Sequence, residues 1–149
     1  MIGIISDTHG LLREEAVAAL AGCSLIVHAG DVGDPEILQH LREIAPVVAV
    51  RGNIDTAPWA TALPETAEAD HKGARIFVLH DLHTLDVDPA AFGIDVVVSG
   101  HSHKPSERLR GGVLYLNPGS AGPRRFKLPI SLARLDTRTR PYRVEFVNL

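Results

Sequence analysis

The segment MIGIISDTHG, residues 1–10, joins an apolar run to a polar end, and the pattern returns as LIVHAGD at residues 25–31 and as VVAVRGN at residues 47–53. The apolar runs predict three buried strands, Met1–Ser6, Leu25–His28 and Val47–Val50. Helices are expected between them at Arg13–Gly22, with acidic residues in its first turn, and at Pro35–Glu43, which starts with proline. This β-α-β-α-β order predicts a parallel sheet with right-handed crossovers.

After Gly52 the pattern changes to short strands separated by turns. Thr56–Pro64 is expected to be a loop, and a short helical segment is expected near Pro89–Phe92. The predicted strands are Thr66–Asp70, Arg75–Leu79, Asp95–Ser99, Glu107–Arg110, Val113–Leu116, Ile130–Leu135 and Arg143–Val147. Turn residues between neighbouring strands indicate a largely antiparallel half. With no linker or internal repeat, we expect a single domain over residues 1–149, with two packed sheets and helices outside.

The composition is that of a soluble globular protein. The 149 residues are 45% hydrophobic and 22% charged, which excludes wholesale disorder. No apolar run approaches the roughly 20 residues of a transmembrane helix, and the first residues lack the features of a signal peptide. We therefore expect a cytoplasmic protein without a membrane partner. The net charge of −3 gives no electrostatic argument for specific nucleic-acid binding, and the lone Cys23 is expected to be a small buried hydrophobe.

Polar residues follow five of the predicted strands. They are Asp7, His9, Asp31, Asn53, His80, His101 and His103. Because ligands bind beyond the carboxyl ends of the strands in α/β sheets, we expect these side chains at one rim. The members of the D-x-H and H-x-H pairs are two residues apart, so extended backbone would direct both to the same side. A glycine precedes three of the seven, at positions 30, 52 and 100, and permits a sharp turn or a close backbone approach.

The set holds two carboxylates, one amide and four imidazoles, which suit Mn²⁺, Fe, Zn²⁺ or Ni²⁺. Seven side chains are too many for one tetrahedral ion with an open position, but they suffice for two ions if one carboxylate bridges. Two divalent ions, two aspartates and a bridging hydroxide leave a net charge near +1, which attracts a phosphate ester anion. Two ions about 3.5–4 Å apart stabilise the attacking and leaving oxygens of an in-line displacement and lower the pKa of bound water towards roughly 7.

These blocks, in this order, resemble the calcineurin-like metallophosphoesterase superfamily. They stand here as Asp7-Thr8-His9, Gly30-Asp31, Gly52-Asn53, His80 and Gly100-His101-Ser102-His103. Within the superfamily the chain is most similar to the small YfcE-type phosphodiesterases, on S-D-T-H-G at residues 6–10, H-x-G-D at 28–31 and N-P-G-S at 117–120. The resemblance implies an α/β fold, a four-layer α/β/β/α sandwich of two mixed sheets. It also implies a divalent-metal-dependent phosphoesterase, in the first place a phosphodiesterase that attacks phosphorus with a hydroxide bound to two metal ions.

The resemblance further implies a role for each residue. The first metal ion would be held by Asp7, His9, Asp31 and His103. The second would be held by Asp31, Asn53, His80 and His101, with Asp31 as the bridge. Asp31, Asn53 and His101 are also expected to take part in catalysis. Mn²⁺ is the first expectation for both ions, with Fe, Zn²⁺ or Ni²⁺ as alternatives, and the substrate is expected to be a small phosphate ester.

Two positions depart from the family pattern. Many members carry a histidine directly after the G-N asparagine, thought to protonate the leaving group or bind the phosphate, where this chain has Ile54 followed by Asp55. General acid catalysis contributes about 10²–10⁴-fold, so its loss favours substrates with good leaving groups. Asp81 follows His80 where relatives usually have glycine, and it either orients a ligand or faces water.

Several residues keep two interpretations at this point. His28 either orients a ligand or is a satisfied core histidine. Trp59 either forms a lip for an aromatic leaving group or marks a contact in a homo-oligomer. His83 is either solvated or a neighbour of the site, and Arg124-Arg125 either face the phosphate or simply follow a turn.

Two functions from different classes remain. The first is the phosphoesterase, and the alternative is a catalytically weak scaffold on the same fold, resembling the retromer subunit built on it. All seven expected ligand types are present, which favours the enzyme.

Overall fold

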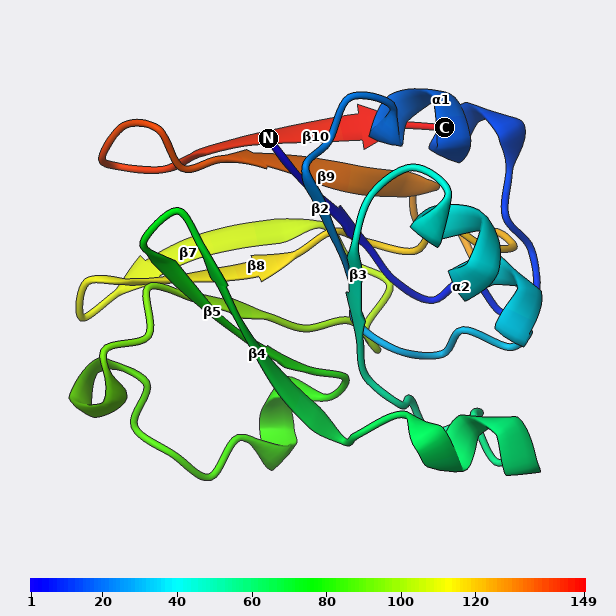
Figure 1. Cartoon of the computed structure of the whole chain (residues 1–149), viewed down its shortest axis with the longest axis horizontal. Helices are drawn as coiled ribbons and strands as arrows, with labels where there is room; N and C mark the ends of the chain where they lie inside the picture. The colour runs from blue at the N-terminus through cyan, green and yellow to red at the C-terminus, as the bar shows by residue number, and fades with distance from the viewer.

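The computed structural model, which describes residues 1–149, contains two five-stranded sheets packed face to face (Figure 1). The first sheet has the strand order β10-β9-β1-β2-β3, and the second has the order β4-β5-β6-β8-β7. The strands of the first sheet are β1 (Ile2–Ile5), β2 (Leu25–His28), β3 (Val47–Ala49), β9 (Ser131–Asp136) and β10 (Arg143–Asn148). Those of the second are β4 (Thr66–His71), β5 (Ala74–Leu79), β6 (Val96–Val98), β7 (Ser106–Arg110) and β8 (Val113–Asn117).

The predicted parallel arrangement of the first three strands is confirmed. β1 pairs parallel with β2, and β2 pairs parallel with β3. The crossovers are α1 (Glu14–Leu20) and α2 (Pro35–Arg42), which lie together outside the first sheet (Figure 1). α2 begins at its proline because Asp34 caps it, accepting a hydrogen bond from the amide of Glu36 at 2.9 Å.

Separate apolar cores hold the layers together. Ile4 of β1 belongs to the core between the two sheets, with Val78 and Leu116 of the second sheet. Its neighbour Ile5 faces the opposite way, into the core beneath α1 and α2. Because successive side chains of a strand alternate between faces, a strand with a layer on each side must be apolar on both. The sequence IGII of β1, which is buried at every position, meets this requirement.

The four-layer α/β/β/α arrangement is confirmed, with a thin outer layer on the second sheet. That layer contains the short 3-10 helices η2 (Leu82–Thr84) and η3 (Ala90–Phe92), so the helical segment predicted near Pro89–Phe92 is also confirmed (Figure 1). The prediction of a plain loop at Thr56–Pro64 is wrong. A 3-10 helix, η1 (Pro58–Ala62), forms there, begun by a proline and anchored by the buried Ala60.

The C-terminal half combines antiparallel hairpins with a parallel centre. β4–β5 and β7–β8 are antiparallel as predicted, whereas β5, β6 and β8 run parallel. β9 and β10 return to the first sheet and pair antiparallel there. The segments after β1 and β6 meet at one rim, where the amide of His101 donates to Asp7 Oδ2 at 3.2 Å.

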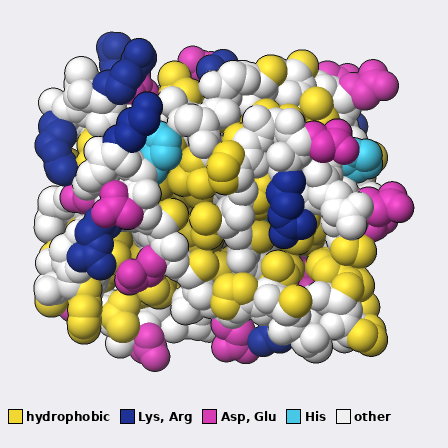
Figure 2. All heavy atoms as spheres, in the orientation of Figure 1, with side chains coloured by type: hydrophobic (Ala, Val, Ile, Leu, Met, Phe, Trp, Pro, Cys, Tyr) yellow, Lys and Arg dark blue, Asp and Glu magenta, His cyan; other side chains and the backbone are white.

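The surface mixes side chains of every kind. Figure 2 shows hydrophobic side chains over the middle of one face, with cationic and acidic side chains interspersed around them. No helix in the structure is both long enough and apolar enough to cross a membrane. The organisation as a single domain stays a prediction.

Candidate metal centre

The seven predicted site residues lie in the segments that follow strands, and these segments converge. Asp7 and His9 follow β1, Asp31 follows β2, Asn53 follows β3, His80 follows β5, and His101 and His103 follow β6. Residues from five parts of the sequence and from both sheets therefore meet at one rim.

The donor atoms form two overlapping clusters, each with its atoms within 4.8 Å of one another. The first contains Asp7, His9 and His103, and the second contains Asp7, Asp31 and His80. Asp7 Oδ1 lies 3.3 Å from His103 Nε2 and 3.7 Å from His9 Nε2. Asp31 Oδ2 lies 3.4 Å from His9 Nε2 and 3.3 Å from His80 Nε2. Each carboxylate thus stands between imidazoles from different strands.

Asn53 and His101 complete the group at its exposed edge. His101 Nδ1 lies 3.2 Å from Asn53 Oδ1. The ring of His101 stands edge-on to that of His80, with 5.2 Å between the ring centroids. These two residues lie outside the compact clusters but in contact with them, so all seven predicted residues are brought to one place.

The prediction of extended backbone at the D-x-H and H-x-H pairs is wrong. Five of the seven residues have φ in the left-handed region: Asp7 at 56°, His9 at 48°, Asp31 at 55°, His101 at 70° and His103 at 61°. Such conformations cost roughly 1–3 kcal/mol each and persist only where the surroundings enforce them. Backbone hydrogen bonds do so here, from the Asp7 amide to the Gly30 carbonyl at 3.0 Å and from the His9 amide to the Asp31 carbonyl at 2.9 Å.

Close backbone approach, expected at the glycines, is confirmed at Gly52 and Gly100. A Cβ at Gly52 would collide with the amide and the carboxylate of Asp31. A Cβ at Gly100 would collide with the hydroxyl of Ser6 and the carboxylate of Asp7. Because only glycine lacks this carbon, the segments after β3 and β6 can lie directly against the two carboxylates.

Buried atoms without hydrogen-bond partners test whether the centre fits a cation. Three such atoms meet here: Asp7 Oδ1, His9 Nε2 and His80 Nε2. An unpaired buried polar atom costs about 1–3 kcal/mol, so native proteins keep few of them. Carboxylate oxygens and imidazole nitrogens are ligands of Mn²⁺, Fe, Zn²⁺ and Ni²⁺. The residues present fit divalent metal ions.

The charges of the cluster also suit a cation. Burial raises the pKa of Asp7 and of Asp31, but contacts with His9 and with His80, respectively, hold each pKa below its ordinary value. The Asp7 carboxylate in turn raises the pKa of His9. Burial opposes a rise in the pKa of His80, and the Asp31 carboxylate produces one. Both carboxylates are therefore negative near neutral pH.

His80 is oriented by its second ring nitrogen. Its Nδ1 lies 2.7 Å from the carbonyl oxygen of Ala29, which can only accept a hydrogen bond. The proton is therefore on Nδ1, which leaves Nε2, beside the two carboxylates, able to bind a metal ion through its lone pair.

His28 is a buried histidine with both ring nitrogens hydrogen-bonded, as the core interpretation predicts. It is fully buried, its Nδ1 accepts from the amide of Gly30 at 3.1 Å, and its Nε2 lies 3.0 Å from Thr8 Oγ1. The Thr8 hydroxyl donates to the Val32 carbonyl at 2.8 Å and so accepts from His28. The ring ties together the segments that carry Asp7 and Asp31, and burial lowers its pKa to about 4.

Asp55 has a structural role that the sequence does not assign. It is 3% exposed, and its carboxylate accepts hydrogen bonds from the amides of Val32 at 3.1 Å, Gly33 at 3.0 Å and Gly52 at 2.9 Å. It therefore joins the segment after β2 to the segment after β3. The available signal was the spacing G-N-x-D, which places a carboxylate two residues beyond Asn53.

The structure places three of the other residues that had two interpretations, Trp59, His83 and Asp81. Trp59 is half-buried against the core beneath α1 and α2, so it does not line the centre. His83 is exposed and bonds to Asp81 Oδ1 at 3.1 Å, whereas Asp81 Oδ2 lies 4.0 Å from His101 Nε2. Burial lowers the pKa of His103, and the positive charge of Arg125 contributes to this effect. Cys23 is buried, as predicted.

A family model described as the calcineurin-like phosphoesterase superfamily domain matches residues 1–140. The chain belongs to this superfamily. A probable metallophosphoesterase of Methanothermobacter thermautotrophicus is 33% identical, over 91% of this chain and 86% of the relative. The phosphodiesterase YfcE of Escherichia coli is 31% identical, over 88% of this chain and 84% of the relative. The similarity to YfcE-type phosphodiesterases is thereby confirmed.

Solved structures share the metallophosphoesterase fold. A predicted phosphoesterase of Streptococcus pneumoniae has a TM-score of 0.79 at 25% identity and covers 99% of this chain and 88% of its own. Vps29 of Chaetomium thermophilum also has a TM-score of 0.79, at 21% identity, and covers 98% of this chain and 94% of its own. The likeness to Vps29 concerns the fold alone.

The low pKa of His28 makes stability depend on pH. The folded state keeps the ring neutral down to about pH 4, whereas the unfolded chain protonates it near 6.5. The contribution of His28 to the free energy of unfolding is fully present above pH 6.5. It falls by about 3 kcal/mol as the pH drops to 4. In denaturant unfolding with a chelator, His28→Gln should lose less stability over this range than the wild type. The exposed-site variant His40→Gln should behave as the wild type, and equal losses in all three proteins would contradict the prediction.

Asp55→Asn should destabilise the protein by about 2 kcal/mol, because one of three buried amides then faces an NH₂ group instead of a carboxylate oxygen. Asp88→Asn, at an exposed residue, is the matched control and should change the free energy of unfolding by less than about 0.5 kcal/mol. The two variants are compared by urea denaturation, and similar values for both would refute the role of Asp55.

Proposed function

We propose that this protein is a phosphodiesterase that depends on two divalent metal ions held at the candidate metal centre. The observation that carries the proposal is the group of buried carboxylate and imidazole atoms that have no partner within the protein. Membership of a family of phosphoester hydrolases and the similarity to YfcE of Escherichia coli support the reaction class.

The first ion is assigned to Asp7, His9, Asp31 and His103, and the second to Asp31, Asn53, His80 and His101. Asp31 is the proposed bridge, because its Oδ2 lies between His9 Nε2 and His80 Nε2 at 3.4 and 3.3 Å. Asp7 contacts the same two imidazoles, at the longer distances of 3.7 and 3.9 Å. The set of nitrogen and oxygen donors without sulfur suits Mn²⁺, with Fe, Zn²⁺ or Ni²⁺ as alternatives.

When bound, the two ions would supply a hydroxide nucleophile near neutral pH and stabilise the charge that develops on the phosphoryl oxygens. The chain's own residues orient the ligands. The Ser6 hydroxyl and the His101 amide hold Asp7 Oδ2 at 2.6 and 3.2 Å. The Ile54 amide holds Asp31 Oδ1 at 3.1 Å. Asn53 and His101 are exposed, so the phosphate ester approaches from their side, and they contact it as the proposed catalytic residues together with Asp31.

Ile54 limits the range of leaving groups. Its side chain is 40% exposed, beside Asn53, and it carries no proton to donate. The oxygen of the departing alcohol must therefore bear its own negative charge or rely on a metal ion or on water.

The alternative is a scaffold without useful turnover, in keeping with the fold shared with Vps29. A scaffold has no need of seven converging donors or of five strained backbone positions. These features favour the enzyme.

Replacement of the bridge should affect both ions. In equilibrium dialysis with Mn²⁺, Asp31→Asn should weaken both binding steps at least about tenfold, since even residues that only orient a ligand contribute about 10–100-fold to affinity. His9→Ala should weaken mainly one step, and the exposed-site variant His40→Ala neither. Unchanged binding of two ions by Asp31→Asn would rule out the bridging role.

Aryl phosphodiesters should be hydrolysed much faster than alkyl diesters, because phenolates leave without a proton. In a series of substituted phenyl diesters, the rate should fall steeply as the pKa of the leaving phenol rises. Ile54→His should flatten this dependence by offering an imidazole to the leaving oxygen, whereas Ile54→Leu should not. If the chemical step limits the rate and the rate does not change with the pKa of the leaving phenol, another group donates the proton.

A further inference from the structure

Two hollows meet beside the candidate metal centre. The first, of about 310 Å³, is lined by the proposed ligands Asn53, His80 and His101. The second, of about 320 Å³, is lined by residues of β7 and β8 and by the segment around η2. Both are lined by Asp81 and His101, so a molecule at the metal centre can extend over these two residues into the second hollow.

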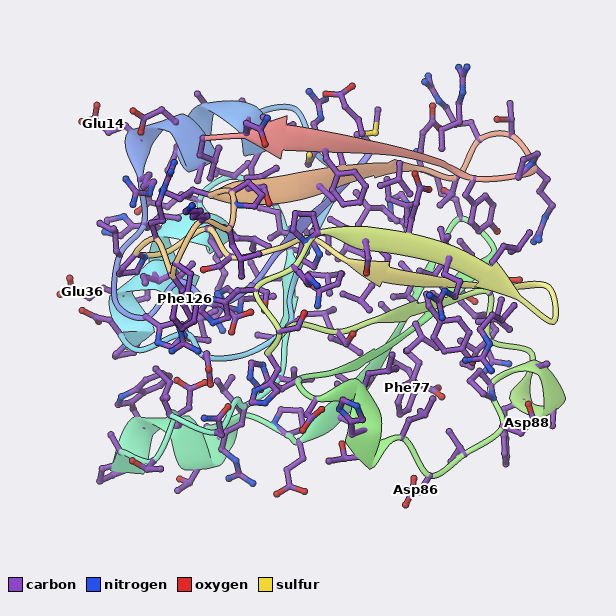
Figure 3. All side chains as sticks on the ribbon, turned by 180° about the vertical axis from the view of Figure 1, so that it is seen from behind. Glu14, Glu36, Phe77, Asp86, Asp88 and Phe126 are labelled. Carbon is purple, nitrogen blue, oxygen red and sulfur yellow. The ribbon has the colours of Figure 1, made fainter.

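The second hollow lies on the outer face of the second sheet. Tyr115 lines it and packs against the small apolar cluster of that face together with Phe77, which Figure 3 labels. Arg108 and Arg110 of β7 line it as well. They are two residues apart on one strand and therefore point to the same side, and Arg108 stands opposite Tyr115 in the β7–β8 pair.

The two arginines have no carboxylate committed to them. Arg51 and Arg75 form ion pairs at 3.1 and 3.6 Å, but neither Arg108 nor Arg110 has a carboxylate oxygen within 4.0 Å. Glu107 also lines the hollow, but it alternates with the arginines along β7. A guanidinium group without a carboxylate partner can bind a phosphate or a carboxylate through two parallel hydrogen bonds.

Asp81 determines where an anion can lie. Its carboxylate accepts hydrogen bonds from the amide and the ring of His83 at 3.0 and 3.1 Å. Its Oδ2 lies 4.0 Å from His101 Nε2, at the junction of the two hollows. A second negative group next to His101 would be repelled there, whereas one farther along would meet Arg108 and Arg110.

We infer that the second hollow is a substrate subsite that selects phosphodiesters whose retained arm carries a second anionic group, such as a terminal phosphate. This inference rests on the proposed function, since the reacting phosphate is placed at the metal centre. The volume is within the range of small-molecule sites, and the ring of Tyr115 offers a surface for a sugar or base between the two phosphates.

A matched pair of substrates tests the subsite by kinetics. Thymidine 3′-(4-nitrophenyl phosphate) is compared with the same compound bearing a 5′-phosphate, so that the leaving group is identical. The wild type should favour the 5′-phosphorylated compound by about tenfold in kcat/KM, through a lower KM. Arg108→Gln and Arg110→Gln should each remove most of this preference and leave hydrolysis of the unphosphorylated compound unchanged. Arg42→Gln, at an exposed arginine of α2, should keep it.

Equilibrium binding provides a readout that does not need turnover. Thymidine 3′,5′-bisphosphate should bind the metal-loaded wild type about tenfold more tightly than thymidine 3′-phosphate, and Arg108→Gln should remove the difference. Equal binding of both probes, or a preference that survives in both arginine variants, would overturn the subsite. If the wild type hydrolyses neither substrate but still prefers the bisphosphate, the proposed function fails and the subsite stands as an anion site.

Discussion

The burial of two carboxylates at the ends of neighbouring parallel strands is the constraint on which the rest of the structure depends. Asp7 is fully buried and Asp31 is 3% exposed. Isolated buried charges are costly unless they are paired or coordinate a metal. Here amides, a hydroxyl and imidazoles surround them, but Asp7 Oδ1 still lacks a hydrogen bond. The two-sheet scaffold thus supplies part of the compensation, and metal ions would supply the partner that Asp7 Oδ1 lacks.

The scaffold meets this constraint by bringing several strand ends within reach of one point. Left-handed backbone at five site residues and the missing Cβ atoms at Gly52 and Gly100 let the segments close on the carboxylates. His28 joins two neighbouring segments through hydrogen bonds to the Gly30 amide and the Thr8 hydroxyl, and Asp55 joins two through backbone amides. The strain is tolerated because fully apolar layers on both faces of β1 hold the strands in register. The packing of the cores thus permits the strained backbone at the rim.

Much of this could be predicted from the sequence. The strand β1 and the two crossover helices could be predicted because local residue patterns determine them. The site could be predicted because its polar residues directly follow the strands. The return of β9 to pair with β1 could not be predicted, because the choice of a strand partner depends on contacts across the whole chain. The left-handed conformations of Asp7 and His103 escaped prediction too, since non-glycine residues adopt them uncommonly and tertiary contacts decide where they occur. The role of Asp55 lies in hydrogen bonds to backbone amides, so the G-N-x-D spacing places its carboxylate but does not show what the carboxylate binds.

The central claim is that the unpartnered atoms of this rim hold two metal ions. Anomalous diffraction from crystals grown with Mn²⁺ tests it most directly. The account predicts two peaks about 3.5–4 Å apart, one beside His9 and His103 and the other beside His80 and His101, with Asp31 between them. A single peak, or ions bound away from Asp7 and Asp31, would contradict it.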